Sequence, residues 1–291
     1  MSDRRASELL IPTKIGGLIL GPLLRWCVRV ALARTSGRKR YQLFYETLHE
    51  VALRGMNYPS GDFRTSGELK VIHEIAARKA SQGAVVLFDV GANIGAYTSE
   101  LVVAFSASGC CPTIHAFEPS SGAFRKLCEV AAANSCVLPR NLALGETVEP
   151  GELHYDHPGS GLGSIYLRDL GEYGVHLSQS ERIEVTTLDM YCSEAGVPHI
   201  DFLKMDTEGS ELAVLRGAQR MIDAGRIDFI QFEFGEAAID ARHYLRDFFR
   251  ILPGYRISRI TRDGLRPLGH YKEVDEIFRT VNFLAERRGI A

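Results

Sequence analysis

The pattern of apolar and polar positions becomes regular from residue 68 onward. Runs of consecutive apolar residues, typical of buried parallel strands, alternate with segments whose apolar residues recur every three or four positions, typical of helices packed on one face. The apolar runs predict strands at 85–90, 113–117, within 136–144, at 201–206 and at 228–234. The helical spacing predicts helices at 68–79, 97–105, 123–133, 211–222 and 237–252.

This alternation predicts an α/β protein with a Rossmann-like fold, in which a mostly parallel, twisted sheet carries helices on both faces. Two closing strands are expected at 255–260 and 280–285, around a turn at 262–264. The segment 146–186 is richer in Gly, Tyr and His, so we expect a substrate-side insertion with short strands there.

Ligands of such sheets bind outside the carboxyl ends of the strands. The first strand ends in DVGANIG, where Asp89, Gly91, Asn93 and Gly95 open the next helix. The two glycines allow a sharp turn and a close approach of the backbone to a ligand. A dinucleotide-binding loop requires glycine where Asn93 stands, and an acidic Asp89 suits a cationic ligand better than a diphosphate. The loop therefore favours S-adenosylmethionine, which carries positive charge and no phosphate, over a dinucleotide.

The second strand ends in FEP at 117–119. Glu118 is placed to accept hydrogen bonds from both hydroxyl groups of a ribose, and Pro119 ends the strand. Alternatively, the glycines only make a tight turn and Glu118 caps the next helix. Because the two motifs follow in order and are separated by one helix, together they predict a nucleoside site.

The densest charged cluster is IDFLKMDTEGSE at 200–211. The period of two along a strand places Lys204 and Asp206 on the same side, and Glu208 follows in the loop. Glu233 lies at the end of an otherwise apolar strand, and a buried carboxylate is costly without a partner, for which Lys204 is a candidate. In the alternative interpretation, Asp206 and Glu208 cap the following helix and Glu233 is a structural ion pair.

Composition narrows the classes of function. The net charge of −2 shows no overall bias toward nucleic acid, and we expect no nucleic-acid partner. The six cysteines form neither a C-x-x-C pair nor a zinc-type spacing with histidine, so we expect free thiols in the reducing cytoplasm and no metal site. We find no cleavable signal peptide, and the apolar run at 15–24 is too short to span a membrane.

The first 66 residues differ from the rest and are expected to form a basic, apolar helical extension before the main domain at 67–291. Residues 1–40 carry nine Lys or Arg against two acidic residues, a net charge of +7. This segment either lies in a membrane interface, or packs on the main domain as a lid or mediates homo-oligomer formation. Glycines and a proline at 16–22 argue against one long helix, which favours the second alternative.

Taken together, the motifs resemble the FkbM family of methyltransferases. The matching segments are DVGANIGAYT at 89–98, FEP at 117–119, IDFLKMDTEGSE at 200–211, VLRGA at 214–218 and QFEFGE at 231–236. The resemblance covers residues 68–236 and implies a class I methyltransferase fold with S-adenosylmethionine as cofactor. Members of this family typically methylate hydroxyl groups of sugars, glycans, glycolipids or polyketide-type metabolites, so it implies an O-methyltransferase with a small-molecule or saccharide acceptor.

The resemblance also implies roles for individual residues. The first loop holds the methionine part of the cofactor, Glu118 the ribose and the third strand end the adenine. The expected cofactor-binding residues are Asp89, Gly91, Asn93, Gly95, Tyr97, Thr98, Glu118, Pro119, Asn141, Ala143 and Leu144. Asp206 and Glu208 are expected beside the transferring methyl group.

An aliphatic hydroxyl is a weak nucleophile, so a nearby base should assist the reaction. Asp206 or Glu208 is our candidate for that base, followed by Glu233 or a histidine of the insertion. Residues of the insertion that could line an acceptor pocket are His154, Tyr155, His157, Ser160, Ser164 and Tyr166. The clustered carboxylates could alternatively hold Mg²⁺. Two other classes stay open: a non-catalytic S-adenosylmethionine-binding module in assembly or regulation, and a nicotinamide-dependent dehydrogenase, which Asn93 disfavours.

Overall fold

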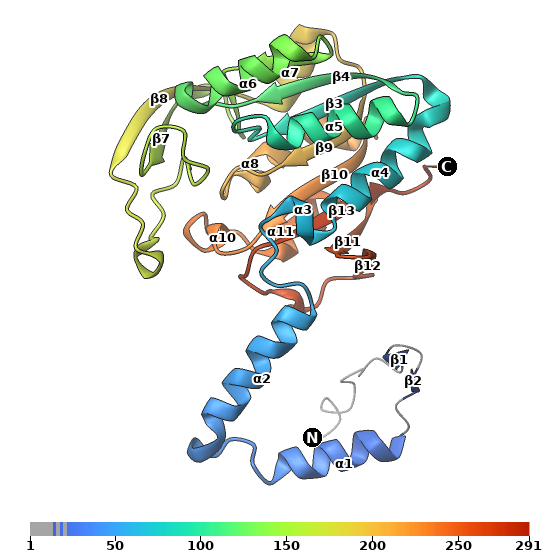
Figure 1. Ribbon diagram of the computed structural model, residues 1–291, viewed down its shortest axis with the longest axis vertical. Helices are drawn as coiled ribbons and strands as arrows, with labels where there is room; N and C mark the ends of the chain where they lie inside the picture. Colours follow the sequence, from blue (N-terminus) through green and yellow to red (C-terminus); the bar gives the residue numbers. More distant parts are fainter. Residues whose placement is uncertain (1–13, 16–17, 20–21, 291) are drawn as a thin grey trace. The chain divides into compact units, whose positions relative to one another are not determined.

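A computed structural model of the chain shows an α/β protein with one large sheet, whose elements are labelled in Figure 1. The structure describes residues 14–15, 18–19 and 22–290. Contacts divide the chain into two compact units, Met1–Gly55 and Met56–Ala291. The division falls before the boundary after residue 66 that composition suggests, because residues 56–66 pack with the second unit.

The described residues of the first unit form two α-helices and two short strands. Its elements are β1 (Lys14–Ile15), β2 (Leu18–Ile19), α1 (Pro22–Ala33), the 3-10 turn η1 (Lys39–Tyr41) and α2 (Gln42–Gly55). Among the residues that the structure describes, no helix combines the length and the apolar character needed to cross a membrane.

Eight strands form the central sheet of the second unit, in the order β12-β11-β13-β10-β9-β3-β4-β5. Their bounds are β3 (Ala84–Val90), β4 (Cys111–Phe117), β5 (Val137–Arg140), β9 (Ile200–Met205), β10 (Ile227–Phe234), β11 (Tyr255–Thr261), β12 (Gly264–Pro267) and β13 (Val281–Arg287). The five strands from β10 to β5 are parallel, which confirms the prediction from the apolar runs. The turn at 262–264 joins β11 to the unexpected edge strand β12, and not to β13 as we expected.

Helices cover both faces of this sheet, as predicted. They are α3 (Phe63–Ser66), α4 (Glu68–Lys79), α5 (Ala96–Ala107), α6 (Ser121–Ala133), α7 (Leu188–Ala195), α8 (Glu211–Arg216), α9 (Gln219–Asp223), α10 (Ala237–Asp240) and α11 (Leu245–Ile251). Alternate side chains of a strand point to opposite faces. Leu87 of β3 accordingly belongs to a core shared with α4, α5 and α6, whereas Phe88 contacts Tyr191 of α7. On the latter face Phe232 of β10 stacks on Phe248 of α11.

Two helices that we expected to be continuous are each broken. The helix expected at 211–222 is split into α8 and α9 by Gly217, where an added Cβ would lie only 2.0 Å from the carbonyl oxygen of Gly145. The helix expected at 237–252 is split into α10 and α11 because the carboxylate of Glu276 accepts two backbone N–H groups and so begins a new helix. Both breaks depend on segments that are distant in sequence, so local spacing could not reveal them.

The insertion forms a small sheet of its own, which confirms the expected short strands. Its strands are β6 (Ala143–Leu144), β7 (Glu149–Tyr155) and β8 (Gln179–Thr186), in the order β6-β8-β7. The small sheet places the insertion next to the carboxyl ends of the central strands, where several of its residues reach the site described below.

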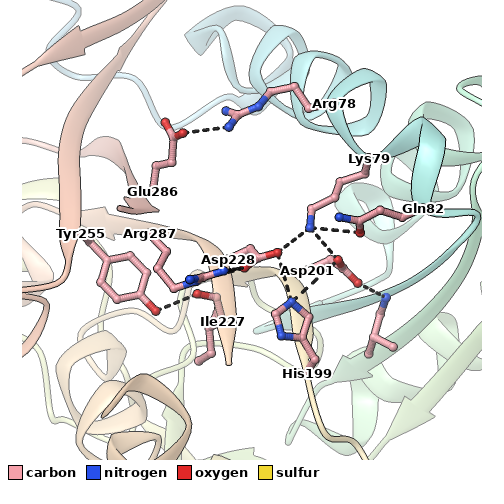
Figure 2. A network of polar contacts seen from close by, with 11 residues as sticks. Arg78, Lys79, Gln82, His199, Asp201, Ile227, Asp228, Tyr255, Glu286 and Arg287 are labelled. Carbon is pink, nitrogen blue, oxygen red and sulfur yellow. Dashed lines mark hydrogen bonds and ion pairs between the residues drawn. The ribbon is translucent and has the colours of Figure 1, made fainter. Parts of the chain in front are cut away.

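At the amino ends of β9 and β10, a buried ion-pair network ties α4 to the sheet (Figure 2). The Nζ atom of Lys79 lies 2.8 Å from a carboxylate oxygen of Asp201 and 2.5 Å from one of Asp228. Arg287 donates to Asp228 at 2.8 Å, and Nε2 of His199 lies 3.1 Å from the same carboxylate. Lys79 thus supplies the positive charge that these two acidic side chains need when they are buried.

Candidate active site

The order of the strands reverses at β3, which has β4 on one side and β9 on the other. Such a reversal opens a crevice outside the carboxyl ends of the two strands, where α/β proteins bind ligands. A cavity with about 760 Å³ of empty space, partly open to solvent, lies there. It is lined by Val90, Gly91, Asn93, Phe117, Glu118, Pro119, Ser120, Leu142, Ala143, Leu144, Leu153, Tyr155, Ser160, Gly161, Gly163, Ile165, Val185, Asp206, Thr207, Glu208 and Ser210.

The loop after β3 lies directly against the backbone that follows β9. Gly91 has a φ of +79°, and a Cβ at this position would lie 1.8 Å from the carbonyl oxygen of Asp206. Only glycine therefore fits. Asn93 also has a left-handed backbone, with a φ of +49°, and its buried Oδ1 has no hydrogen-bond partner among the described residues. An unpartnered acceptor in the wall of a cavity is well placed to meet a ligand.

Glu118 joins the loops after β3 and β4. Its buried carboxylate accepts hydrogen bonds from the amide of Asn93 at 2.8 Å and from the amide of Ser120 at 2.7 Å. Burial raises the pKa of Glu118 to about 7, although both hydrogen bonds act in the opposite direction. The side chain lines the cavity and has acceptor capacity left for ribose hydroxyl groups.

Part of the cavity wall is apolar. Pro119, Ala143 and Leu144 line the cavity and give it apolar surface. Asn141 lies outside the lining: its side-chain amide donates to the carbonyl oxygens of Glu118 and Pro119, both at 2.9 Å. Asn141 therefore fixes the loop that carries Glu118.

Four residues that we expected to touch the cofactor lie behind the wall of the cavity. Thr98 donates to Asp89 at 2.6 Å, and Asp89 is fully buried. The hydroxyl of Tyr97 donates to Gln231 at 2.9 Å. A Cβ at Gly95 would meet side chains of α6 at 2.9 Å, so this glycine permits close packing of the helices. In this geometry the four residues support the loop and do not face the cavity.

Three carboxylates meet at the ends of β9 and β10. Asp206, Glu208 and Glu233 each place one oxygen within 4.8 Å of the others. Burial and the charge of Asp206 raise the pKa of Glu208 to about 8. Burial, followed by the charges of Asp206 and Glu208, raises the pKa of Glu233 well above its usual value. Both shifts favour the protonated forms of Glu208 and Glu233.

A second cavity, with about 1360 Å³ of empty space, adjoins the first. The two share Gly91, Asn93, Gly161, Asp206 and Glu208. The second cavity is also lined by Pro59, Gly61, Leu162, Arg168, Leu170, Tyr173, Val175, Glu233, Glu236, Arg279 and Thr280. The carboxylate cluster therefore stands where the two cavities meet, which is suitable geometry for a reaction between two bound molecules.

Lys204 is not the partner of Glu233, contrary to our suggestion. Its Nζ atom lies 3.3 Å from Asp206 and 3.6 Å from Asp89, and these charges outweigh burial and raise the pKa of Lys204. The expected placement of Lys204 and Asp206 on one side of β9 is confirmed. Within the described part of the chain, the ion pairs of Lys204 go to Asp206 and Asp89 and not to Glu233.

In the alternative interpretation, Asp206 and Glu208 cap the helix that follows this loop. The structure shows that neither side chain does so. Glu211, the first residue of α8, instead accepts the amides of Thr207 at 2.7 Å and Gly209 at 3.1 Å, so its carboxylate ties the loop to the start of the helix. The carboxylates of Asp206 and Glu208 consequently remain at the two cavities.

Two residues of the insertion fix Glu208. Arg168 forms an ion pair with its carboxylate, and the Arg168 side chain is only 7% exposed. Ser164 donates to the backbone carbonyl of Glu208 at 2.7 Å, while Glu208 itself has a left-handed φ of +53°. The sequence reasoning missed Arg168, because it lies 40 positions from Glu208 in an insertion without a recognisable motif.

The other insertion residues that we singled out fall into two groups. Tyr155 and Ser160 line the first cavity. His154, His157 and Tyr166 line neither of the two cavities. The geometry therefore gives no support to a histidine of the insertion as the base.

Comparison with known families gives one match that spans more than half of the chain. The sequence model described as the methyltransferase FkbM domain matches residues 89–257. No curated protein matches the sequence.

The solved structures that match this chain are remote in sequence. An FkbM methyltransferase from Methylobacillus flagellatus KT is 17% identical with a TM-score of 0.43, and the match covers 69% of this chain but only 43% of that protein. A precorrin-6y C5,15-methyltransferase from Geobacter metallireducens GS-15 is 11% identical with a TM-score of 0.37, covering 75% of this chain and 89% of the other. Aeropyrum pernix fibrillarin, solved with natively bound S-adenosylmethionine, is 14% identical with a TM-score of 0.36, covering 70% and 66%.

Proposed function

The chain belongs to the FkbM family of methyltransferases, and from this premise we propose that it methylates a hydroxyl group of a sugar, glycan, glycolipid or polyketide-type acceptor. Its fold is the class I methyltransferase fold, and its cofactor is S-adenosylmethionine. The nature of the acceptor atom and the roles of individual residues are the proposed part.

The residues of the first cavity fit this cofactor. The backbone at Gly91 leaves space that any Cβ would remove, and the unpartnered Oδ1 of Asn93 can accept from an ammonium group. Glu118 would bind the ribose hydroxyls, and Ala143 with Leu144 would contact the adenine. When bound, S-adenosylmethionine supplies an electrophilic methyl group on a positively charged sulfur.

One observation carries the choice of a hydroxyl acceptor: the carboxylates of Asp206 and Glu208 line both cavities. A hydroxyl group must lose its proton as its oxygen forms the new bond to carbon. A carboxylate whose pKa is raised to about 8 is a stronger base than an ordinary one once it is ionised. We assign this proton acceptor to Glu208 or Asp206, with Glu233 as the group that shares the proton.

The proposal is tested by methyl transfer from isotope-labelled S-adenosylmethionine into a whole extract of the host, which is then separated into metabolites, glycans, RNA and protein. We expect label in methyl ethers, which resist mild alkali. Label found only in amines or in alkali-labile esters would contradict the hydroxyl assignment. Exclusive labelling of RNA or protein would contradict the small-molecule or saccharide acceptor.

Two other functional classes are separated by a titration. S-adenosylhomocysteine should bind and NAD should not, whereas a dehydrogenase would bind NAD. A non-catalytic module would bind S-adenosylhomocysteine but give no labelled product with any fraction of the extract.

A divalent cation is the second candidate feature of this site, because the three carboxylate oxygens are spaced closely enough to share an ion. Cations already neutralise two of the three: Lys204 lies 3.3 Å from Asp206, and Arg168 is paired with Glu208. We therefore expect activity to persist in EDTA. Loss of activity that Mg²⁺ restores would favour the metal-dependent version.

A further inference from the structure

The segment around α1 is basic and contains no acidic residue between positions 25 and 40. Its six positive charges are Arg25, Arg29, Arg34, Arg38, Lys39 and Arg40. On α1, Trp26 is 62% exposed and Val30 is 37% exposed. These two residues are four positions apart, so they lie on the same side of the helix. The helix therefore combines exposed apolar surface with nearby positive charge.

A second apolar stripe runs along α2. Phe44, Leu48 and Val51 are 54%, 44% and 60% exposed, and their spacing places them on one face. The acidic residues Glu46 and Glu50 fall on a different side of the helix, at about 100° of rotation per residue. The stripe thus carries no acidic group that would repel an anionic surface.

Hydrogen bonds within the first unit hold the end of α1 against the start of α2. The hydroxyl of Tyr45 donates to the carbonyl oxygen of Leu32 at 3.1 Å and lies 2.6 Å from the hydroxyl of Thr35. Gln42 donates to the carbonyl oxygen of Arg38 at 3.3 Å. The basic turn at 34–40 is therefore fixed between the two helices that carry exposed apolar residues.

We propose that this unit, through Trp26, Val30, the α2 stripe and the basic turn, binds the surface of an anionic lipid bilayer. Apolar side chains would enter the interface while Lys and Arg contact phosphate-bearing headgroups, as in other interfacial helices. Residues 1–40 carry +7 and the whole chain −2, so the remaining residues carry −9 and attraction to anionic lipid is confined to the first segment. This inference does not depend on the proposed methyl transfer.

A second copy of the chain is a less suitable occupant of this surface. Pairing two such units would bring two basic turns, each with several positive charges and no acidic residue, close together. Like charges repel, whereas an anionic bilayer offers the opposite charge beside an apolar layer.

Trp26 is the only tryptophan in the chain, so it reports directly on the proposed surface. The full chain is titrated with neutral phosphatidylcholine vesicles and with vesicles containing about 30% phosphatidylserine, which supply a negative surface potential. We expect a blue shift of tryptophan emission and co-sedimentation with the anionic vesicles only, weakened by salt. Brominated lipid should quench the emission.

Charge and apolar surface are tested separately. Replacing Arg38, Lys39 and Arg40 by Gln should weaken partitioning by about 100-fold, because each lost positive charge weakens binding to the anionic surface by about fivefold. Leu48→Ser should weaken partitioning at both low and high salt, because salt screens charges but not apolar contacts. The matched control replaces Arg125, Lys126 and Arg262, which are exposed on the second unit, and should leave binding unchanged.

The proposal is overturned if Trp26 emission and sedimentation do not respond to anionic vesicles at low salt. It is also overturned if the control triple variant loses binding as strongly as the basic-turn variant. A lipid-free dimer with blue-shifted Trp26 emission, dissociated by Leu48→Ser, would assign the surface to a second copy instead.

Discussion

Glu208 combines a left-handed backbone, a buried carboxylate and an ion pair with Arg168. Left-handed backbone is costly for a residue with a Cβ and persists where the surroundings enforce it. Here Ser164 holds the Glu208 carbonyl and Glu211 holds the neighbouring amides. Several independent contacts therefore converge on the orientation of one carboxylate.

We predict that Glu208→Gln and Asp206→Asn lower turnover by about 10²- to 10⁴-fold while affinity for S-adenosylhomocysteine changes little. A base acts mainly in the transition state, so its loss affects the chemical step more than donor binding. Steady-state kinetics and calorimetry measure the two effects. Glu129→Gln, on the exposed side of α6, is the control that removes a carboxylate away from the site.

Melting curves are needed for Asp206→Asn, because this change removes one of the charges next to the buried Lys204. Near-normal turnover in both variants would remove these residues from the role of base. Glu233 would then be the next residue to test, since it is the third member of the cluster.

At Glu118 the structure adds a positioning role to the binding role. We predict that Glu118→Gln lowers affinity for S-adenosylhomocysteine by about 10- to 100-fold, since charge-assisted hydrogen bonds to the ribose are lost. Calorimetry measures the affinity. A melting curve of the ligand-free variant checks that the protein stays folded when the hydrogen bonds to Asn93 and Ser120 are altered. Unchanged affinity in a folded variant would show that Glu118 only links the two loops.

At the scale of secondary structure, the sequence predicts those helices and strands whose extent depends on the local pattern of apolar residues. The helix at 68–79 and the buried strands of the parallel sheet follow directly from apolar periodicity. Contacts between distant segments decide the rest: Gly145 breaks one helix at Gly217, and Glu276 begins another at α11.

The same limit applies to the candidate site. Motifs located the loops of Gly91, Glu118 and Asp206, because strand ends in a parallel sheet converge. They could not indicate that Asp89 faces Lys204 behind the wall, or that Arg168 reaches Glu208 from the insertion. Side-chain direction at the end of a strand depends on packing, which composition does not reveal.

The ion-pair network in Figure 2 joins elements that are far apart in sequence, and its loss should be felt throughout the second unit. We predict that Lys79→Met destabilises the protein by about 3 to 5 kcal/mol, because Asp201 and Asp228 lose their buried partner. Denaturant unfolding measures this change. Donor affinity should be unaffected, since the network lies at the opposite ends of the strands from the cavity.

Lys126→Met is the matched control, because Lys126 is exposed on α6. Equal stability of the two variants would show that Arg287 and His199 alone compensate the two carboxylates. At Asp228, burial opposes ionisation, but hydrogen bonds from His199, Lys79 and Arg287 outweigh it and lower the pKa. The stabilisation by this group is therefore present above its ordinary pKa and is lost as the pH falls through the lowered one.

At the scale of the whole molecule, titrating groups set how stability depends on pH. Burial raises the pKa of Glu68 and of Glu118 to about 7, and burial with the charge of Asp206 raises that of Glu208 to about 8. The folded state then holds protons that the unfolded state has released, so these groups reduce stability as the pH rises. Burial lowers the pKa of His115 from 6.5 to about 4. Between these two values the unfolded state holds more protons, so His115 increases stability as the pH rises. A net loss of stability is expected between about pH 6.5 and pH 8.

The charge of the bound cofactor should change the protonation of the carboxylates in the site. S-adenosylmethionine carries a sulfonium charge that S-adenosylhomocysteine lacks, and a positive charge beside Glu208 and Glu233 favours their ionised forms. We predict that, near pH 7.5, binding of S-adenosylmethionine releases more protons than binding of S-adenosylhomocysteine. Calorimetry in two buffers of different ionisation enthalpy measures the number released. Glu208→Gln should reduce the difference between the ligands, whereas Glu129→Gln should preserve it. Equal proton release by both ligands in the unmodified protein would place the sulfonium away from the carboxylate cluster. The methyl group bonded to it would then also be too distant for these carboxylates to act in its transfer.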